Sequence, residues 1–282
     1  MKKNPASRLR SILALSLTIT LSSTLLGAIP EKPAPIQAVC VAHRGFSTAA
    51  PENTVSSMKA AIDVGADGNE MDVRRSADGI LFLNHDGNLK RYTGEDLNPS
   101  TLTMAELRKR DVGSFKGEQF KGEPVATFDE VIAMHVGTKT CPVVELKQDG
   151  IEAQTLEILK KHDMVKKSII IAFSAKACAK MRELDADIFI AWLCSKGKEE
   201  AQDAYGDRII KTCESCGINA VDMEYHAVTP ELVNRLHAAG LTVFCWTVDQ
   251  PEPMAECLKA GVDSVTTNNP DKLLEVLKEM KK

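Results

Sequence analysis

Residues 219–247 read NAVDMEYHAVTPELVNRLHAAGLTVFCWT, and this stretch contains the repeating unit that decides the fold. The apolar runs at 219–223 and 241–247 predict two strands. Between them, Thr229 is an expected helix N-cap, Pro230 fits the first helical turn, and Gly240 is an expected helix terminator. A strand, a helix and a strand in this order are typical of two parallel strands joined by a crossover helix.

The same alternation of strand and helix extends along most of the chain. Helical segments follow most of the strands, with a capping-box pair at Thr127 and Glu130 and expected terminators at Gly65 and Gly261. Eight such repeats in about 250 residues favour an α/β fold of the (β/α)₈ TIM-like barrel type over an open doubly wound sheet. The eight runs that we predict to be its strands are 38–42, 67–73, 142–146, 168–173, 187–193, 219–223, 241–247 and 263–267.

One segment interrupts this alternation after the second strand unit. A short apolar run at 80–84 extends that unit, and residues 86–125 after it are polar and turn-rich, with one short helix expected from Thr103. A loop of this length inside a compact domain is usually functional. We therefore predict a small insertion that covers one end of the barrel as a lid or side module.

Residues 1–30 are predicted to be a signal peptide rather than part of the barrel. Four basic residues precede an apolar run without charges, and Gly27-Ala28 offers small residues for cleavage. Residues 31–37 are then a linker and residues 38–282 the barrel domain. The expected location is periplasmic or extracellular, and an uncleaved N-terminal membrane anchor is the alternative because the apolar run approaches the length of a membrane span.

Composition narrows the partners that the chain is expected to have. The net charge is −4 and there is no basic block, so nothing indicates nucleic-acid binding, and no obligate protein partner is evident. Cys213 and Cys216 form one isolated C-x-x-C, which argues against a zinc site. A local disulfide and two thiols on a helix face both stay open.

Chemically active side chains recur at the ends of the predicted strands. Catalytic groups of a barrel belong at the carboxyl ends of its strands, so side chains at these positions should meet. Residues two apart on a strand, such as Glu70 and Asp72, point to the same face. The strand-end residues are His43 and Arg44, Glu70 and Asp72, His85 and Asp86, Glu145 and Lys147, and Trp246.

Three of these residues, Glu70, Asp72 and Glu145, predict a metal site. Three carboxylates at one barrel end repel each other strongly unless a cation lies among them. Oxygen ligands suit a hard ion such as Ca²⁺ or Mg²⁺, whereas zinc would prefer histidine or cysteine. Any one of them alone would be an ordinary strand-end residue; their shared position carries the inference.

With these residues in place, the chain resembles the glycerophosphodiester phosphodiesterase family. His43-Arg44-Gly45, followed by Pro51-Glu52-Asn53-Thr54, resembles the opening signature of that family. The resemblance covers roughly residues 38–275 and is most specific in the N-terminal half. It continues through Gly65-Ala66-Asp67, Glu70-x-Asp72, Asp78-Gly79, His85-Asp86, Glu145-x-Lys147, Phe173-Ser174, Trp246-Thr247-Val248 and Gly261-Val262-Asp263.

This resemblance implies hydrolysis of glycerophosphodiesters, small-molecule substrates, to sn-glycerol 3-phosphate and an alcohol. It implies that His43 and His85 form the acid–base pair. It also implies that one divalent cation is bound by the three carboxylates named above. Arg44 is expected to contact the phosphate, Lys147 to lie near it, Trp246 to pack on the substrate, and Glu52 to lie near the metal.

Two positions depart from the family pattern. Thr267-Asn268-Asn269-Pro270 replaces the Thr-Asp-x-Pro often found at the last strand end, which puts any role of that position in doubt. Asn69 stands where the family usually has an apolar strand residue. Neither departure touches the predicted catalytic or metal-binding residues.

Three alternatives stay open at the level of sequence. The enzyme could act on lysophospholipids, although the insertion shows no apolar patch for a membrane surface. A non-catalytic binding barrel would be expected to have lost a metal or histidine position, and none is lost. A broader phosphoesterase or sugar-phosphate enzyme would leave the His43-Arg44 and His85-Asp86 pairs unexplained.

Overall fold

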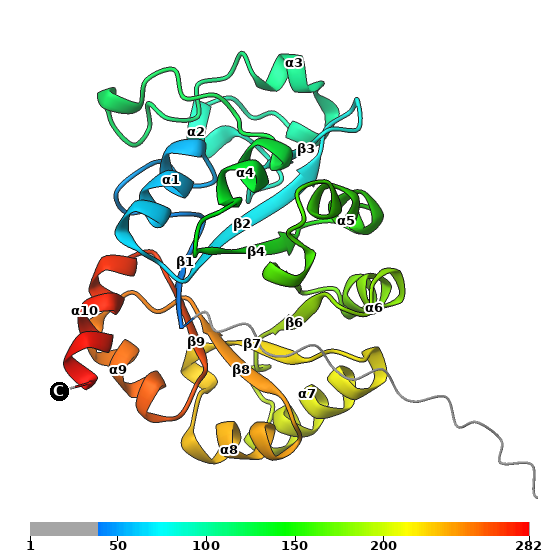
Figure 1. The fold of residues 1–282 in the computed structure, drawn as a ribbon, viewed down its shortest axis with the longest axis vertical. Coiled ribbons are helices and arrows are strands. Elements are labelled where there is room, and N and C mark those ends of the chain that lie inside the picture. Colours follow the sequence, from blue (N-terminus) through cyan, green and yellow to red (C-terminus); the bar gives the residue numbers. More distant parts are fainter. Residues whose placement is uncertain (1–38, 282) are drawn as a thin grey trace, which may run out of the picture. The chain divides into compact units, whose positions relative to one another are not determined.

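The computed structural model describes residues 39–281, and eight parallel strands in this range close into a barrel. β1 pairs with β9 on one side and with β2 on the other, so the sheet closes on itself (Figure 1). The predicted (β/α)₈ barrel is confirmed; the predicted signal peptide and linker lie outside the described residues. The barrel strands are β1 (Cys40–Ala42), β2 (Gly68–Arg75), β4 (Cys141–Leu146), β5 (Ile169–Ala172), β6 (Phe189–Cys194), β7 (Ala220–Glu224), β8 (Thr242–Trp246) and β9 (Ser264–Thr267).

Helices surround the barrel and connect its strands (Figure 1). The predicted helix starts are present: Thr229 accepts a hydrogen bond from the backbone N–H of Leu232, and Thr127 and Glu130 form a capping box. Between residues 39 and 281, no helix has the length and apolar character that crossing a membrane requires. The surrounding helices are α1 (Val55–Val64), α4 (Phe128–His135), α5 (Glu152–Lys161), α6 (Ala175–Leu184), α7 (Gln202–Cys216), α8 (Pro230–Ala238), α9 (Pro251–Lys259) and α10 (Pro270–Met280).

Both faces of the barrel wall are buried, which explains why its strands are continuous apolar runs. On β5, Ile169 and Ile171 pack inside the barrel, whereas Ile170 and Ala172 pack in the layer that includes the helices. Leu193 on β6 and Phe244 on β8 complete part of the inner core. This inner core fills the barrel below the end at which the polar strand-end residues lie.

The insertion after the second strand unit has its own small core. β3 (Leu81–Leu83) pairs antiparallel with β2, and the chain then forms α2 (Lys90–Thr93) and α3 (Met104–Leu107) with 3₁₀ turns at Pro99–Thr101 and Glu118–Phe120. Two further 3₁₀ turns, Val165–Lys167 and Tyr225–Ala227, lie outside the insertion. The buried side chains of the insertion core are Phe82, Leu89, Tyr92, Met104, Leu107, Val112 and Val125.

Asn69, a departure from the family pattern, is explained by a polar contact behind β2. Its amide donates to the backbone oxygen of Met58 at 3.0 Å and lies 3.2 Å from Nε2 of His135. His135 Nδ1 lies 2.8 Å from the carbonyl oxygen of Val131 on its own helix. A buried amide needs such partners, so Asn69 and the buried His135 are a matched structural pair.

Cys213 and Cys216 both lie on α7. The buried Cys213 thiol donates to the backbone oxygen of Ala220 at 3.8 Å, while Cys216 is half-buried beside Ser215. This placement agrees with two thiols on a helix face.

Candidate active site

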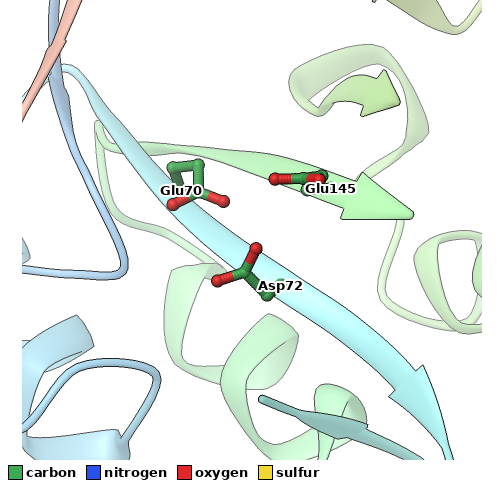
Figure 2. A group of neighbouring side chains, drawn as sticks. All are labelled: Glu70, Asp72 and Glu145. Carbon is green, nitrogen blue, oxygen red and sulfur yellow. The ribbon is translucent and has the colours of Figure 1, made fainter. Parts of the chain in front are cut away.

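Glu70, Asp72 and Glu145 converge at the carboxyl ends of β2 and β4. These strands are paired in parallel with Asp72 opposite Glu145, and Figure 2 shows the three carboxylates gathered on one side of the two strands. One ligand atom from each carboxylate lies within 4.8 Å of the other two. All three residues are buried, so the like charges are poorly screened.

The backbone before α1 fixes these carboxylates in place. The N–H of Arg44 donates to Glu70 Oε2 at 2.7 Å, and the amide of Asn53 donates to Asp72 Oδ2 at 2.6 Å. Arg44 and Asn53 both have φ of 56°, and Gly45 follows at 78°. A Cβ on Gly45 would come within 2.5 Å of the backbone of Ser57, so the His-Arg-Gly turn requires glycine there.

The three carboxylates fit a divalent cation. Glu70 Oε1 and Asp72 Oδ1 are buried and have no hydrogen-bond partner among the described residues. Burial, followed by the charges of its neighbours, raises the pKa of Glu70 well above its usual range, and burial and Asp72 do the same for Glu145. Orphaned oxygens in a cluster of carboxylates are the donor set that a hard cation satisfies.

His43 lies just beyond the end of β1 and is oriented by a neutral partner. Its Nδ1 is 2.8 Å from Oδ1 of Asn268, and the Asn268 amide nitrogen donates to Asp249 Oδ2 at 2.8 Å. Asp249 therefore fixes which way the amide points, and His43 donates from Nδ1. Burial, then the charge of Arg44, lowers the pKa of His43 to about 4, so its free Nε2 is an acceptor at neutral pH.

His85 follows β3 and is oriented by a charged partner. Its Nδ1 lies 2.7 Å from Oδ1 of Asp86, which accepts the ring proton. Arg74 holds the backbone by donating from Nη2 to the His85 carbonyl at 2.6 Å. Burial lowers the pKa of His85, and the carboxylates of Asp72 and Asp86 oppose that shift.

Arg44 and Glu52 join the site to the insertion. Arg44 Nη1 donates to Glu52 at 2.8 Å, and its Nε lies 3.5 Å from Asp72. Arg91 on α2 donates to both oxygens of Glu52 and, from Nε, to Asp86 at 3.0 Å. Although burial opposes it, the charge of Arg44 and the hydrogen bonds from Arg91 lower the pKa of Glu52, which stays ionised.

Lys147 follows β4 and Trp246 ends β8, and both were predicted to lie at the site. Lys147 Nζ lies 2.8 Å from Glu145 and 3.6 Å from Asp72, so it is within reach of the predicted metal site. Trp246 donates from its indole N–H to the backbone oxygen of Asp222 and forms an edge contact with Phe173 at 5.7 Å between ring centroids. Both aromatic side chains line the same cavity as Arg44 and Glu70.

A cavity of about 140 Å³ lies between these groups. Its wall combines the catalytic candidates of one side with apolar side chains of β5, β6 and β8 on the other. His226, which follows the end of β7, does not line the cavity and is paired with Glu224 at the surface. The lining residues are His43, Arg44, Glu70, His85, Glu145, Ile171, Phe173, Leu193, Asp222, Trp246, Thr247 and Thr266.

Four residues of this site were not predicted to have a role there: Asn53, Arg91, Asp222 and Asp249. Asn53 was visible only as part of the Pro-Glu-Asn-Thr signature. Asp222 is an interior strand position in an apolar run, where a carboxylate is itself an unusual signal. Arg91 and Asp249 act through other side chains, and no local pattern distinguishes them.

The fold and the pocket define a (β/α)₈ barrel enzyme with its site at the carboxyl ends of the strands. Residues 43–272 match the profile of the "Glycerophosphoryl diester phosphodiesterase family". A glycerophosphodiester phosphodiesterase of Caldanaerobacter subterraneus is 30% identical over 250 residues, with 86% of this chain and 99% of that protein covered. The chain therefore belongs to the glycerophosphoryl diester phosphodiesterase family, as the sequence motifs indicated.

Solved structures agree with this assignment. A phosphodiesterase of Oleispira antarctica, solved with the product sn-glycerol-3-phosphate, superposes with a TM-score of 0.75 at 28% identity, covering 84% of this chain and 96% of that one. The glycerophosphodiester phosphodiesterase of Thermotoga maritima superposes with a TM-score of 0.68 at 26% identity, covering 84% and 98%.

Proposed function

We propose that this protein hydrolyses glycerophosphodiesters to sn-glycerol 3-phosphate and an alcohol, with one divalent cation, Ca²⁺ or Mg²⁺, and with His43 and His85 as the acid–base pair. The observation that carries the proposal is the three-carboxylate cluster, two of whose members, Glu70 and Glu145, line one cavity together with both histidines and Arg44. The product bound in the Oleispira antarctica phosphodiesterase supports the substrate class.

Glu70, Asp72 and Glu145 would hold the cation, which would polarise the phosphoryl oxygens. Arg44 offers a planar guanidinium to the anionic oxygens of the diester, and Glu52 fixes that guanidinium in one orientation. Lys147 adds a second positive charge on the β4 side. These residues would bind and orient the phosphate in the cavity that both imidazoles line.

The two histidines have environments that favour different proton states. His43 is held by the neutral amide of Asn268 and stays unprotonated, as a base requires. His85 is held by the carboxylate of Asp86, whose charge opposes the lowering of the His85 pKa by burial and stabilises the imidazolium that a proton donor must form. We therefore assign His43 as the base that removes a proton from the attacking hydroxyl and His85 as the acid that protonates the departing alkoxide. Two groups of the same type can take opposite roles when their local environments separate their pKa values.

The decisive experiment is turnover of glycerophosphocholine by the purified protein with Ca²⁺, with Mg²⁺ and with a chelator. Release of sn-glycerol 3-phosphate should require one of the ions and return when it is added back. Unchanged turnover with chelator would contradict the proposed metal site, and no release with either ion would contradict the proposed substrate.

Lysophospholipids are the second candidate substrates, and one observation favours them. Phe173 lines the cavity with 51% of its surface exposed, and Phe115 on the insertion is 41% exposed. Both could contact an acyl chain. A panel that sets lysophosphatidylcholine against glycerophosphocholine decides between the two, and we expect the water-soluble diester to be preferred.

We also propose that the protein acts after export. The support is the basic and apolar segment at residues 1–30, which has the layout of a signal peptide. Fractionation of the producing cells followed by N-terminal sequencing tests this. A mature chain that starts near residue 30 outside the cytoplasm is expected, and an intact N-terminus in the membrane fraction would indicate the anchor instead.

A further inference from the structure

Asp222 on β7 is a buried carboxylate with no role in the proposed metal site or acid–base pair. It lines the same cavity as His43 and Trp246, and only 2% of its surface is exposed. Its Oδ1 has no hydrogen-bond partner among the described residues. It is also absent from the group of three carboxylates whose oxygens lie within 4.8 Å of one another.

The apolar surroundings of Asp222 make it energetically unfavourable to leave this buried oxygen without a hydrogen bond. Its neighbours across the sheet are Leu193 on β6 and Phe244 on β8, both apolar and both in the inner core of the barrel. The indole N–H of Trp246 donates to the backbone oxygen of Asp222 rather than to its carboxylate. A buried polar group without a partner is strongly unfavourable, so such a group in a cavity wall indicates a ligand that satisfies it.

We propose that Asp222 forms the floor of a subsite for a hydroxyl-bearing group, and that the glycerol end of the diester occupies it. This inference rests on the proposed function and names the residue that would recognise the glycerol. The carboxyl of Asp222 would hydrogen-bond a glycerol hydroxyl that an alkyl phosphate lacks.

The chemistry of the cavity favours a hydroxyl over the other groups of a diester. A phosphate carries negative charge, which Arg44 in the turn after β1 attracts and which an ionised Asp222 would repel. Burial, followed by the charge of Glu145, raises the pKa of Asp222 well above its usual range, and a protonated carboxyl attracts a cationic group poorly. A neutral hydroxyl can donate to the carboxyl or accept from it, so it suits either form.

The test compares binding of sn-glycerol 3-phosphate and of n-propyl phosphate, which has the same chain length and no hydroxyl. We expect wild type to bind the glycerol phosphate roughly 10–100-fold more tightly, because a site built for a hydroxyl is left unpaired by the analogue. Asp222→Leu should reduce that preference to within about 3-fold. Asp222→Asn, whose amide still donates and accepts, should keep most of it.

Thermal stability separates recognition from a structural role. Asp222→Leu removes an unpaired buried polar group, so its melting temperature without ligand should rise. The matched control is Thr155→Val, because Thr155 on α5 has a buried hydroxyl without a hydrogen-bond partner among the described residues and does not line the cavity. It should change stability similarly and leave the glycerol preference intact.

A glycerol preference in Asp222→Leu equal to that of wild type would overturn the inference. If that variant also lost affinity for Ca²⁺, Asp222 would belong to the metal site instead. Because the assay measures binding, it remains decisive if no diester is turned over. Absent turnover with an intact, Asp222-dependent preference would count against the proposed function and not against the subsite.

Discussion

The two histidines of the site belong to different regions of the molecule, and the regions hold them differently. His43 extends from the barrel wall and is oriented by the neutral Asn268, at the end of the last strand. His85 lies where the insertion begins and is oriented by Asp86, which Arg91 of the insertion holds in turn. The barrel thus supplies a neutral hydrogen-bond partner to a buried imidazole, and the insertion supplies a charged partner to a more exposed one.

This difference supports the proposed division of proton transfer between His43 of the barrel and His85 at the start of the insertion. A rigid neutral partner suits a group that must stay unprotonated, and a carboxylate suits a group that must carry a proton. Substitutions of each histidine, and then of the groups that orient it, test whether the two imidazoles differ in this way.

Removal of either imidazole should lower kcat more than any other substitution considered. His43→Ala and His85→Ala are each expected to lower kcat by about 10²–10⁴-fold, because each loses one proton transfer. Steady-state kinetics on glycerophosphocholine measures this. His237→Ala is the control, since His237 is paired with Asp263 outside the cavity and should keep full activity. Full turnover in both site variants would end the acid–base assignment.

Asp86→Asn should have the next largest effect, roughly 10–100-fold on kcat. The amide keeps the size of the side chain but no longer favours the imidazolium, so the pKa of His85 should fall. The pH profile of kcat is the measurement, and its basic limb should move to lower pH. A change confined to KM would instead indicate a role in binding.

Arg91→Met should lower kcat/KM by about 5-fold, because a partly exposed ion-pair network contributes on the order of 1 kcal/mol. Arg91 is 41% exposed, so the wild-type advantage should shrink as salt rises. Arg110→Met is the matched control, as Arg110 lies on the same insertion and pairs with Glu95 away from the site. Equal losses in the two variants would show that only the fold of the insertion matters.

Asn268→Asp should have the smallest effect on the maximal rate and a clear effect on pH dependence. A carboxylate beside Nδ1 stabilises imidazolium, so the pKa of His43 should rise from about 4, by on the order of one unit. If His43 is the base, the acid limb of kcat/KM moves to higher pH. Movement of the basic limb would exchange the assigned roles of the two histidines.

Much of this site could be predicted because its parts are local in sequence. Glu70 and Asp72 share a strand face by their spacing alone, and His43 and Glu145 end strands whose parallel order the chain alternation predicts. The barrel could be predicted from the same alternation, because the strands and helices are each marked by an apolar pattern and many helices by capping residues.

The remaining features depend on contacts that no local pattern encodes. Asn268 was read as a departure that left a carboxylate missing, whereas the structure shows it oriented by Asp249 and bonded to His43. Arg91 joins Glu52 and Asp86 from within the insertion, which was predicted as a lid or side module without a role for this residue. The isolation of Asp222 is visible only when the apolar side chains around it are known.

The hydrogen bond between His43 and Asn268 links the site to the order in which the chain folds. It joins residues 225 positions apart, across the β1–β9 pairing that closes the barrel. Contacts of such long range form late, because the intervening chain must first be ordered. Asn268 is also among the last residues of the barrel to be synthesised, so the proposed base acquires its orienting partner only when the last strand is in place.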